Sequence, residues 1–496
     1  MIRRFPRLLL TTVVLATPTV VTSALTAIIF GATIFDFVPS ASDETFYWHQ
    51  TLIVSRVGLA GGYYTYEELP PPSGNSVRFG FHGPAFPVLY GLAGRALGWE
   101  PYSAILFNLA LITVALAVFI RLVKPDNRQL LVVLLLVITF WPLWLYLPSN
   151  MQETLQQAFA IVMAAIFYRL LSGPAPSRLF RSASCGFIVL ASLVKPTWSL
   201  LAVPFFCLAV GDRTWRRLAA ALTKAATLIV TMYAVFSYWS SPYPYYDFVG
   251  RLAQALRLSP VQGARLFVGH AYGNTLALFQ SEQHGIDVLV VFQVLFLVAV
   301  MIALLTTRIK RRQAMAEPLF HLFNIGSILA FVVLFYAARV GYRPFAVHLL
   351  ISLLLLIAHR RFRLMALIVA GNALLVGGFL GFYREWRTPS FNYDRARLVL
   401  ARNALQSLIT YDSSQNAWCN TALSAASPFA YEELIALPPG IGYSVTLDSH
   451  LLRLPLKSKY ILLNAGSKLP QADLHLQWLG TTPVGIVYRN LDAPCR

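Results

Sequence analysis

Long stretches without a charged side chain constrain the fold of this chain more than any other feature. Between Arg7 and Asp36 the sequence contains no Asp, Glu, Lys or Arg, and further windows share this property or nearly so. They lie at 100–121, 128–153, 153–169, 181–212, 224–247, 287–308, 317–339, 343–360 and 363–384. A membrane-spanning helix needs about 20 mostly apolar residues. With 57% hydrophobic and 12% charged residues, the chain is predicted to be a polytopic α-helical membrane protein.

The window 181–212 admits two interpretations, a long kinked helix or two short helices that meet at Lys195-Pro196. Loops rich in Lys and Arg stay in the cytoplasm. Arginine clusters stand on both sides of this window, so the chain must cross the membrane an even number of times between them. These arginines are Arg169, Arg178 and Arg181 before the window and Arg213, Arg216 and Arg217 after it. We therefore predict two short helices, with Lys195 at the outer face.

The same rule orients the remaining spans. It predicts about 11 transmembrane helices, with the N-terminus in the cytoplasm and the C-terminus outside. The first span is interpreted as an uncleaved anchor, since its apolar run exceeds the usual length in signal peptides. The net charge of +19, from 40 Lys and Arg against 21 Asp and Glu, is then explained by membrane topology, and a nucleic-acid partner is not expected.

The polar segments indicate two domains. Residues 1–385 form the predicted membrane module, with large outer loops at 36–100 and 241–286. Residues 386–496 form a predicted soluble α/β domain, with strands near Tyr460–Leu463 and Val484–Tyr488. Cys419 and Cys495 both lie in this domain and are candidates for a disulfide in an oxidising compartment, the alternative being two free thiols.

Candidate catalytic residues stand in the first outer loop. Asp43 and Glu44 are adjacent carboxylates just beyond a span, suited to accept a proton from a hydroxyl or to hold a metal ion; the simpler interpretation is a solvated loop start. His82 stands in a turn with Gly83 and Pro84, where it orients a substrate or a carboxylate, or simply caps the turn.

Candidate anion-binding residues stand in two other outer turns. Arg339 and Arg343 occupy a short loop without an acid, and arginine binds phosphate oxygens through its planar fork. The alternative is that they pair with distant acids such as Glu67 or Glu68. Lys195 suits an anionic headgroup, or it snorkels to the interface.

Taken together, these motifs resemble the GT-C superfamily of membrane glycosyltransferases, in the branch of protein O-mannosyltransferases and the lipid A aminoarabinose transferase. Asp43-Glu44 with Tyr47 resembles the D-E-x-x-Y start of that branch's first outer loop. His82-Gly83-Pro84, Lys195-Pro196 and the turn 339–344 with Tyr342 resemble its later outer elements, although the Arg-Tyr order in the last is reversed. The resemblance covers about residues 1–385.

This resemblance implies an inverting glycosyltransferase of the bacterial cytoplasmic membrane, which uses a polyprenyl-phosphate sugar donor at the outer face. Asp43 would be the general base, with Glu44 beside it to position the acceptor or Asp43. Arg339, Arg343 and Lys195 would hold the donor phosphate. The acceptor is a protein, a lipid or a glycan.

Cofactor and class are left open by the sequence. Some members of the superfamily use a divalent cation such as Mg²⁺ or Mn²⁺, held here by Asp43 or Glu44, and others use none. A lipid-linked glycan ligase or polymerase is the closest alternative, although it would not need the Asp-Glu pair. A flippase or transporter is disfavoured, because it would carry ionisable residues within its spans.

Overall fold

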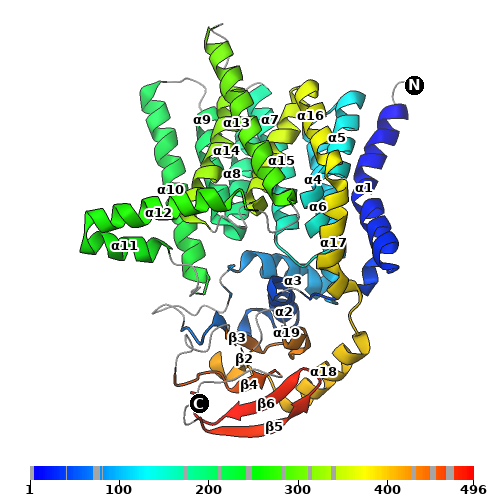
Figure 1. The fold of residues 1–496 in the computed structure, drawn as a ribbon, viewed down its shortest axis with the longest axis vertical. Coiled ribbons are helices and arrows are strands. Elements are labelled where there is room, and N and C mark those ends of the chain that lie inside the picture. The colour runs from blue at the N-terminus through cyan, green and yellow to red at the C-terminus, as the bar shows by residue number, and fades with distance from the viewer. Residues whose placement is uncertain are drawn as a thin grey trace.

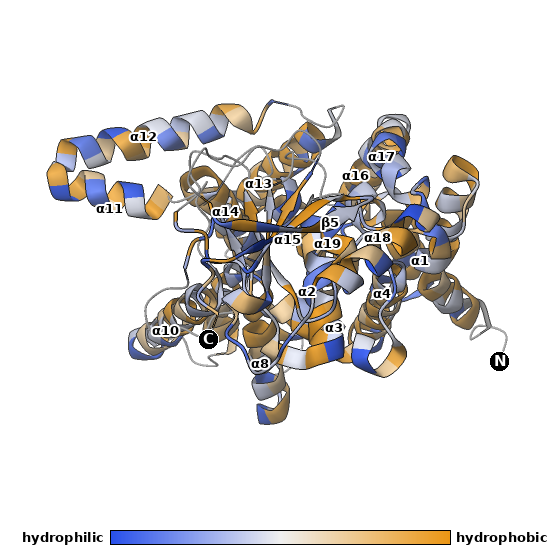
Figure 2. Cartoon of the chain, turned by 90° about the horizontal axis from the view of Figure 1, so that it is seen from below, coloured by the Kyte–Doolittle hydropathy of each residue, from blue (hydrophilic) through white to orange (hydrophobic). Residues whose placement is uncertain are grey.

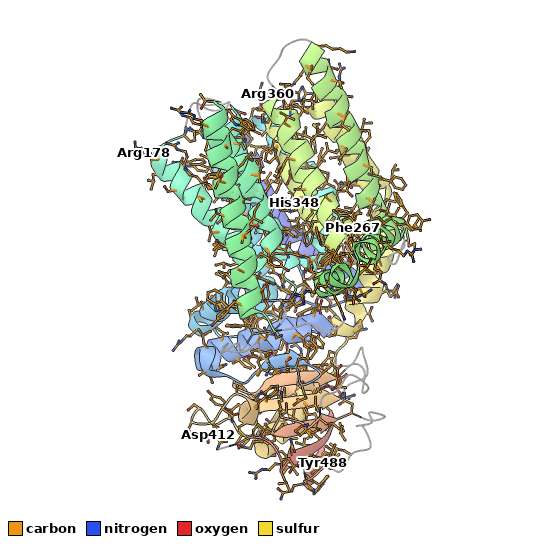
Figure 3. The ribbon with its side chains drawn as sticks, turned by 90° about the vertical axis from the view of Figure 1, so that its left-hand side faces the viewer. Arg178, Phe267, His348, Arg360, Asp412 and Tyr488 are labelled. Atoms are coloured by element: carbon orange, nitrogen blue, oxygen red, sulfur yellow. A yellow bond between two sulfur atoms is a disulfide. The ribbon has the colours of Figure 1, made fainter. Side chains whose placement is uncertain are left out.

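The computed structural model consists of a helical bundle with a sheet layer packed against one end (Figure 1). It describes residues 5–40, 42–70, 79–80, 82–172, 176–209, 214–241, 248–280, 285–310, 315–336, 342–425, 432–446, 454–464 and 474–495. Arg178 and Arg360 lie at the end of the bundle away from Asp412 and Tyr488 of the sheet layer (Figure 3). We call these two ends of the bundle the basic end and the sheet end.

The bundle contains most of the helices. They are α1 (Phe5–Phe30), α4 (Ser103–Val123), α5 (Asn127–Thr139), α6 (Trp141–Tyr146), α7 (Glu153–Ser172), α8 (Arg178–Val194), α9 (Ala202–Ala209), α10 (Trp215–Trp239), α13 (Ile286–Lys310), α14 (Ala316–Phe335), α15 (Tyr342–Ala358), α16 (Phe362–Leu374) and α17 (Val376–Phe391). A 3-10 segment, η3 (Pro196–Leu201), joins α8 to α9.

Helix α15 lies at the centre of the bundle. All of its residues from Pro344 to Ala358 are buried, as expected for a helix that is apolar on every side. Helix α7, which packs beside it, is buried over most of its length. In contrast, α10 lies at the periphery and buries only Ala221, Ala225 and Met232.

The number of described helices that are long and apolar enough to span a membrane is lower than the predicted number of spans. Every predicted window contains helix, but within the described ranges six helices are long and apolar enough to cross a membrane, or seven if the bent pair α16 and α17 counts as one. The remaining windows hold shorter helices, α5, α8, α9 and α15. The length of a charge-free window overestimates the length of its helix, because a helix can end without a charged residue. The break between α5 and α6, just before Pro142, is an example.

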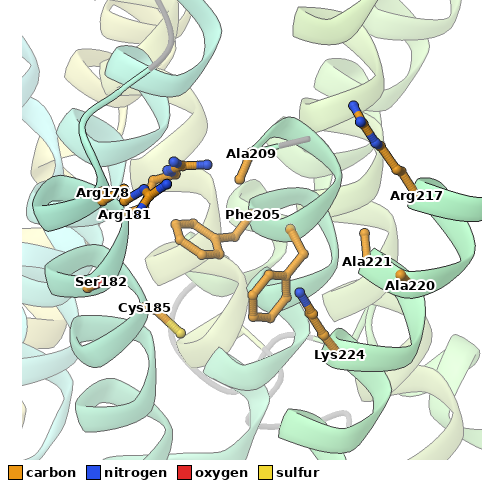
Figure 4. A pocket seen from close by; sticks show the side chains of 11 residues that line it. Arg178, Arg181, Ser182, Cys185, Phe205, Ala209, Arg217, Ala220, Ala221 and Lys224 are labelled. Carbon is orange, nitrogen blue, oxygen red and sulfur yellow. The ribbon is translucent and has the colours of Figure 1, made fainter. Parts of the chain in front are cut away.

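The window around Lys195 contains two short helical segments, as predicted. Helix α8 ends at Val194, and the chain turns back through Pro196 into η3 and α9. Arg178 and Arg181 before this pair and Arg217 after it line one cavity (Figure 4), so both arginine clusters lie at the same end of the bundle. Lys195 therefore lies near the sheet end.

The sheet layer has six strands in the order β1-β3-β2-β4-β6-β5. They are β1 (Tyr64–Tyr66), β2 (Thr421–Ala425), β3 (Gly442–Thr446), β4 (Tyr460–Leu463), β5 (Leu476–Thr482) and β6 (Gly485–Asn490). The first four strands in this order are parallel, and β5 and β6 form an antiparallel hairpin. With α18 (Arg395–Leu408) and α19 (Glu432–Ala436), the sheet confirms the predicted α/β domain.

The sheet takes one strand from the first loop, which the sequence did not predict. Strand β1 pairs with β3, so that Tyr64 lies opposite Tyr443. Gly62 lets the loop approach the domain closely, because a Cβ atom there would lie 1.9 Å from the carbonyl oxygen of Asn420. The sheet is thus joined to the bundle by a pairing between strands that are 379 positions apart in the sequence.

The first loop also contributes α2 (Ser42–Val57) and α3 (Ala85–Leu97), which lie between the bundle and the sheet (Figure 1). His49 contacts the carbonyl oxygen of Ile441 at 2.7 Å, and Gln50 donates to the hydroxyl of Tyr443 at 2.7 Å. These buried hydrogen bonds fix α2 on the sheet. The start of α2 therefore has a defined position at the sheet end.

One helical hairpin lies outside these layers. Helices α11 (Phe248–Leu258) and α12 (Pro260–Ala277) project sideways from the bundle as a hairpin, with hydrophilic and hydrophobic residues mixed along both (Figures 1 and 2).

In the sheet domain, Cys419 and Cys495 form the predicted disulfide, with Cα atoms 5.4 Å apart.

Candidate active site

Asp43 lies in the first turn of α2, at the junction of bundle and sheet. Its side chain is 28% exposed, and its two oxygens face different partners. Oδ1 lies 3.9 Å from Nε2 of His82, and Oδ2 lies 3.8 Å from Nη1 of Arg343. Three of the predicted site residues, which are far apart in the sequence, therefore meet around one carboxylate.

Arg343 opens the central helix α15 and contacts two acids. Its Nη1 atom lies 3.5 Å from Oε1 of Glu153 in the first turn of α7, besides the contact with Asp43. Its guanidinium carbon lies 5.9 Å from the ring centre of Tyr146. The absence of an acid in its own loop was thus misleading, because acids from α2 and α7 lie beside it.

The acids named as alternatives lie elsewhere. Glu68 is fully buried and accepts hydrogen bonds from Ser458 and from the backbone nitrogen of Lys457 in the sheet domain. Glu67, also buried, follows strand β1 directly. Among the described residues, the pairing of Arg343 with acids is therefore real, but the partners are Asp43 and Glu153.

His82 is positioned by the turn that precedes α3. Gly83 has a φ of 78°, a left-handed conformation that favours glycine, and a Cβ atom there would lie 2.8 Å from the ring of Phe236. The imidazole packs on the ring of Tyr47, with ring centres 4.8 Å apart. The His-Gly-Pro motif thus directs the imidazole toward Asp43.

The two predicted substrate-binding tyrosines are buried. Tyr47 lies one turn after Asp43 on α2, and its hydroxyl accepts a hydrogen bond from Gln152. Burial raises the pKa of this hydroxyl well above its usual value, and the negative charges of Asp43 and Glu153 act in the same direction. Tyr342 shares a 2.7 Å hydrogen bond with Tyr146. In this conformation both tyrosines form the walls of the site.

Lys195 lies beside the last described residue before the segment that contains Arg339. Its Nζ atom lies 5.3 Å from the ring centre of this residue, Tyr336. Arg339 itself lies outside the described residues. Lys195 is half-buried, at the point where α8 ends. Of the three predicted phosphate-binding cations, Lys195 and Arg343 are therefore among the described residues.

The side chain of Glu44 pairs with a buried arginine. Its side chain is fully buried, and Oε1 accepts a hydrogen bond from Nη1 of Arg387, which is also fully buried. Arg387 donates through Nη2 to the carbonyl oxygen of Leu145 at 3.1 Å. Glu44 thus joins α2 to the bundle and, in this conformation, cannot reach a substrate that approaches from solvent.

The carboxyl group of Asp43 has a pKa below its usual value. Burial raises this pKa, but His82, whose Nε2 atom lies 3.9 Å away, and the charge of Arg343 lower it by a larger amount. Asp43 is therefore ionised at neutral pH. It can accept a proton, which is the requirement for a general base.

A resident metal ion does not fit the described side chains. No group of three or more His, Cys, Asp or Glu residues converges within the described ranges. Asp43 and His82 lie near each other, but the guanidinium of Arg343 occupies the other side of Asp43 and would repel a cation there. Glu44, the other candidate ligand, is engaged by Arg387.

Two residues of this region were not singled out from the sequence. Glu153 follows the break at Pro148-Ser149-Asn150, and an acid at a helix start beyond such a break is a signal that could have indicated it. Arg387 follows the last predicted span directly. No local feature of the sequence indicated Arg387, because its partner Glu44 is 343 positions away.

The chain resembles several solved structures of glycosyltransferases. It aligns with ArnT from Cupriavidus metallidurans bound to undecaprenyl phosphate at 12% identity, over 97% of this chain and 98% of that chain, with a TM-score of 0.48. It aligns with the Archaeoglobus fulgidus oligosaccharyltransferase in complex with Zn and sulfate at 13% identity, over 97% and 74%, with a TM-score of 0.48.

A further alignment is to the archaeal oligosaccharyltransferase AglB from the same organism, in complex with an inhibitory peptide and a dolichol-phosphate. It has 11% identity, covers 91% of this chain and 69% of that chain, and has a TM-score of 0.45. No protein-family model and no curated protein matches the sequence.

Proposed function

We propose that the chain is an inverting glycosyltransferase, which moves a sugar from a polyprenyl-phosphate donor to an acceptor at the outer face of the bacterial cytoplasmic membrane. The observation that carries this proposal is the contact between one partly exposed carboxylate, Asp43, and one arginine, Arg343, at the end of a membrane bundle. Sugar transfer from a lipid phosphate needs a base for the acceptor and a cation for the leaving phosphate.

The reaction is a single displacement at the anomeric carbon. An oxygen of Asp43 takes the proton of the acceptor hydroxyl as the hydroxyl oxygen forms its bond to the anomeric carbon. The bond between that carbon and the phosphate oxygen breaks on the opposite face, and its electron pair leaves with the phosphate. Arg343 and Lys195 stabilise the charge that grows there. Because attack and departure occur on opposite faces, the configuration inverts.

The contacts of Arg343 supply a means of coupling donor binding to the base. Its guanidinium lies near both Asp43 and Glu153. A phosphate that binds Arg343 competes with Asp43 for the same nitrogen. Loss of the 3.8 Å contact removes one of the charges that lower the pKa of Asp43. Asp43 therefore becomes a stronger base when the donor is bound.

The proposed orientation follows from the charges at the two ends. The basic end carries Arg178 and Arg360, as expected for a cytoplasmic face, and the sheet end is then periplasmic. The sheet layer lies next to Asp43, and its surface is available to an acceptor glycan, lipid or protein. A disulfide between Cys419 and Cys495 suits this compartment.

The test is Asp43→Asn, assayed with a synthetic polyprenyl-phosphate sugar in detergent beside a donor-binding measurement. The substitution keeps the shape of the side chain but removes the basic oxygen. Transfer should fall by about two to four orders of magnitude, with donor binding retained. Asp36→Asn is the matched control, because Asp36 is in the same loop but contacts Thr33 and Arg395, outside the site.

Two results would contradict the proposal. An Asp43→Asn protein that binds donor and transfers at the wild-type rate would remove the assignment of the base. A wild-type protein that moves the lipid across liposomes without transferring sugar would favour the flippase alternative.

A further inference from the structure

The hairpin of α11 and α12 leaves the bundle near the sheet end. Helix α10 starts beside the cavity at the basic end and ends at Trp239, and the hairpin begins at Phe248. Tyr233 and Trp239, in the last two turns of α10, are both exposed. Exposed Tyr and Trp side chains are typical of the interface between membrane and water. The hairpin therefore starts at the depth of this interface, and Figure 3 shows it end-on at Phe267, between the basic end and the sheet layer.

Both helices of the hairpin run crosswise to the bundle. In Figure 1 they project from its side, and Figure 2 shows them next to each other when the chain is seen from the sheet end. Helices α10, α13 and α14 are each long and apolar enough to cross a membrane, so they run along the membrane normal. A hairpin that runs crosswise to them lies in the plane of the membrane.

Helix α12 is apolar on two opposite sides. On one side, His270 stacks on Phe248 of α11, with ring centres 3.8 Å apart. The opposite side, about 160° around the helix at Val268 and Tyr272, is exposed. We call this row of side chains the α12 stripe; it consists of Val261, Val268, Tyr272 and Leu276, which are 49% to 69% exposed. A continuous apolar row of this kind marks a contact surface, whereas single exposed apolar residues do not.

The α12 stripe continues onto a surface that faces the bilayer. Phe279 lies one turn beyond Leu276, and its ring centre is 6.1 Å from that of Phe292 on α13. Both phenylalanines are exposed, as is Phe296 one turn further along α13. Because α13 is long and apolar enough to span the membrane, its exposed rings contact lipid. The α12 stripe thus extends a lipid-facing surface.

The polar side chains of the hairpin are typical of an interfacial helix. Arg251 and Arg257 of α11 and Arg265 of α12 are exposed, and residues 248–277 contain no Asp or Glu. Helices that lie in the plane of a membrane surface combine an apolar side with a polar side rich in Lys and Arg. Long arginine side chains reach the headgroups while the helix itself lies deeper. The charges therefore suit the same placement as the α12 stripe.

The hairpin is also fixed to the end of α14. Nδ2 of Asn274 donates to the carbonyl oxygens of Val333 and Tyr336, at 2.9 Å each. Carbonyl groups at the end of a helix have no partner within it, so α12 caps α14. The position of the hairpin therefore sets the position of the residues that follow α14, beside Lys195.

We propose that α11 and α12 form an interfacial hairpin, whose α12 stripe is buried among the lipids of the leaflet at the sheet end. The hairpin fixes the end of α14 at a set depth below the membrane surface. This proposal does not depend on the glycosyltransferase activity, because it rests on the exposed side of α12 and not on the site around Asp43.

The experiment measures the membrane depth of spin labels by electron paramagnetic resonance. Single cysteines are introduced into the full chain with Cys185→Ser and Cys207→Ser, which leaves the disulfide intact, and the labelled proteins are placed in nanodiscs of phosphatidylglycerol and phosphatidylcholine. Collisions with oxygen report lipid, and collisions with a water-soluble nickel chelate report water. Val268→Cys and Tyr272→Cys test the α12 stripe, and Gln254→Cys tests the exposed polar side of α11.

The labels in the α12 stripe should lie about 5–10 Å below the headgroup boundary. Their oxygen collisions should be as frequent as those in Phe292→Cys, the lipid-facing control on α13. The label in Gln254→Cys should collide with the nickel chelate as often as the label in Leu400→Cys. Leu400 is the matched aqueous control, because it is an exposed apolar residue of α18 in the sheet layer.

Three results would overturn the proposal. Nickel collisions in the α12 stripe as frequent as those in Leu400→Cys would place the stripe in water. Low collision rates with both reagents would place it against protein, and dipolar broadening between labels would then identify a second copy of this chain as the occupant. Equal depth of the stripe and of Gln254→Cys would mean that the whole hairpin is buried in the membrane core.

Discussion

The buried ion pair between Glu44 and Arg387 gives the sharpest test of the structure. Glu44→Gln leaves the Arg387 guanidinium without a counter-charge in a site from which water is excluded, since both side chains have no exposed surface. Removal of one partner of a buried pair costs about 3–5 kcal/mol. The remaining acceptor of Arg387 is the carbonyl oxygen of Leu145, which carries no net charge. We therefore expect a loss in the free energy of unfolding within that range.

Replacement of both partners should restore most of this loss. In Glu44→Met with Arg387→Met, no charge remains buried, and side chains of similar length fill the space. Such replacements are often neutral or stabilising, so the double variant should lie within about 1 kcal/mol of the wild type. The assay is equilibrium unfolding in mixed micelles, applied to the wild type, both single variants and the double variant as a cycle.

The control is an ion pair that is exposed. Arg395 and Asp36 are 3.6 Å apart, with side chains 49% and 42% exposed, so Arg395→Met should cost less than about 1 kcal/mol. If Glu44→Gln is as stable as the wild type, the pair of Glu44 and Arg387 is not shielded from water as the structure shows. If the double variant is no more stable than Glu44→Gln alone, the cost came from lost packing, and the reasoning from charge fails.

Three further predictions concern other parts of the molecule. Arg343→Ala should lower the affinity for a polyprenyl-phosphate sugar about ten- to a hundredfold, and Lys195→Ala should lower it less. Wild-type affinity in both variants would contradict the proposed binding of the donor phosphate by these two residues. Burial raises the pKa of Glu433 to about 7, so folding gains from its protonated form, and that gain is lost as pH rises from about 4.5 through 7. Glu433→Gln should therefore resemble the wild type in stability at pH 4 and exceed it by up to ~3 kcal/mol at pH 8, in unfolding scans at both pH values. Cys419→Ser with Cys495→Ser opens a disulfide with a sequence separation of 76 and should destabilise the sheet domain by ~4 kcal/mol, seen as faster proteolysis of that domain.

The sequence by itself predicted the elements whose cause is local. Charge-free windows predict helices in a membrane, and each such window contains helix, because apolar side chains favour the bilayer regardless of their tertiary partners. Lys195-Pro196 predicted a break, since proline cannot continue a helix from the preceding turn. Strand β4 covers Tyr460–Leu463, the predicted segment, because its apolar run is short and bounded by polar residues.

Only the tertiary structure decided what each charged side chain does. Asp43 and Glu44 are neighbours in the sequence, yet one is partly exposed beside His82 and Arg343, and the other is buried against Arg387. Successive residues of a helix point about 100° apart, so adjacent side chains meet different surroundings. Glu153 contacts Arg343, 190 positions away, and Arg387 contacts Glu44, 343 positions away. No local pattern encodes such distances, because they depend on how the helices pack.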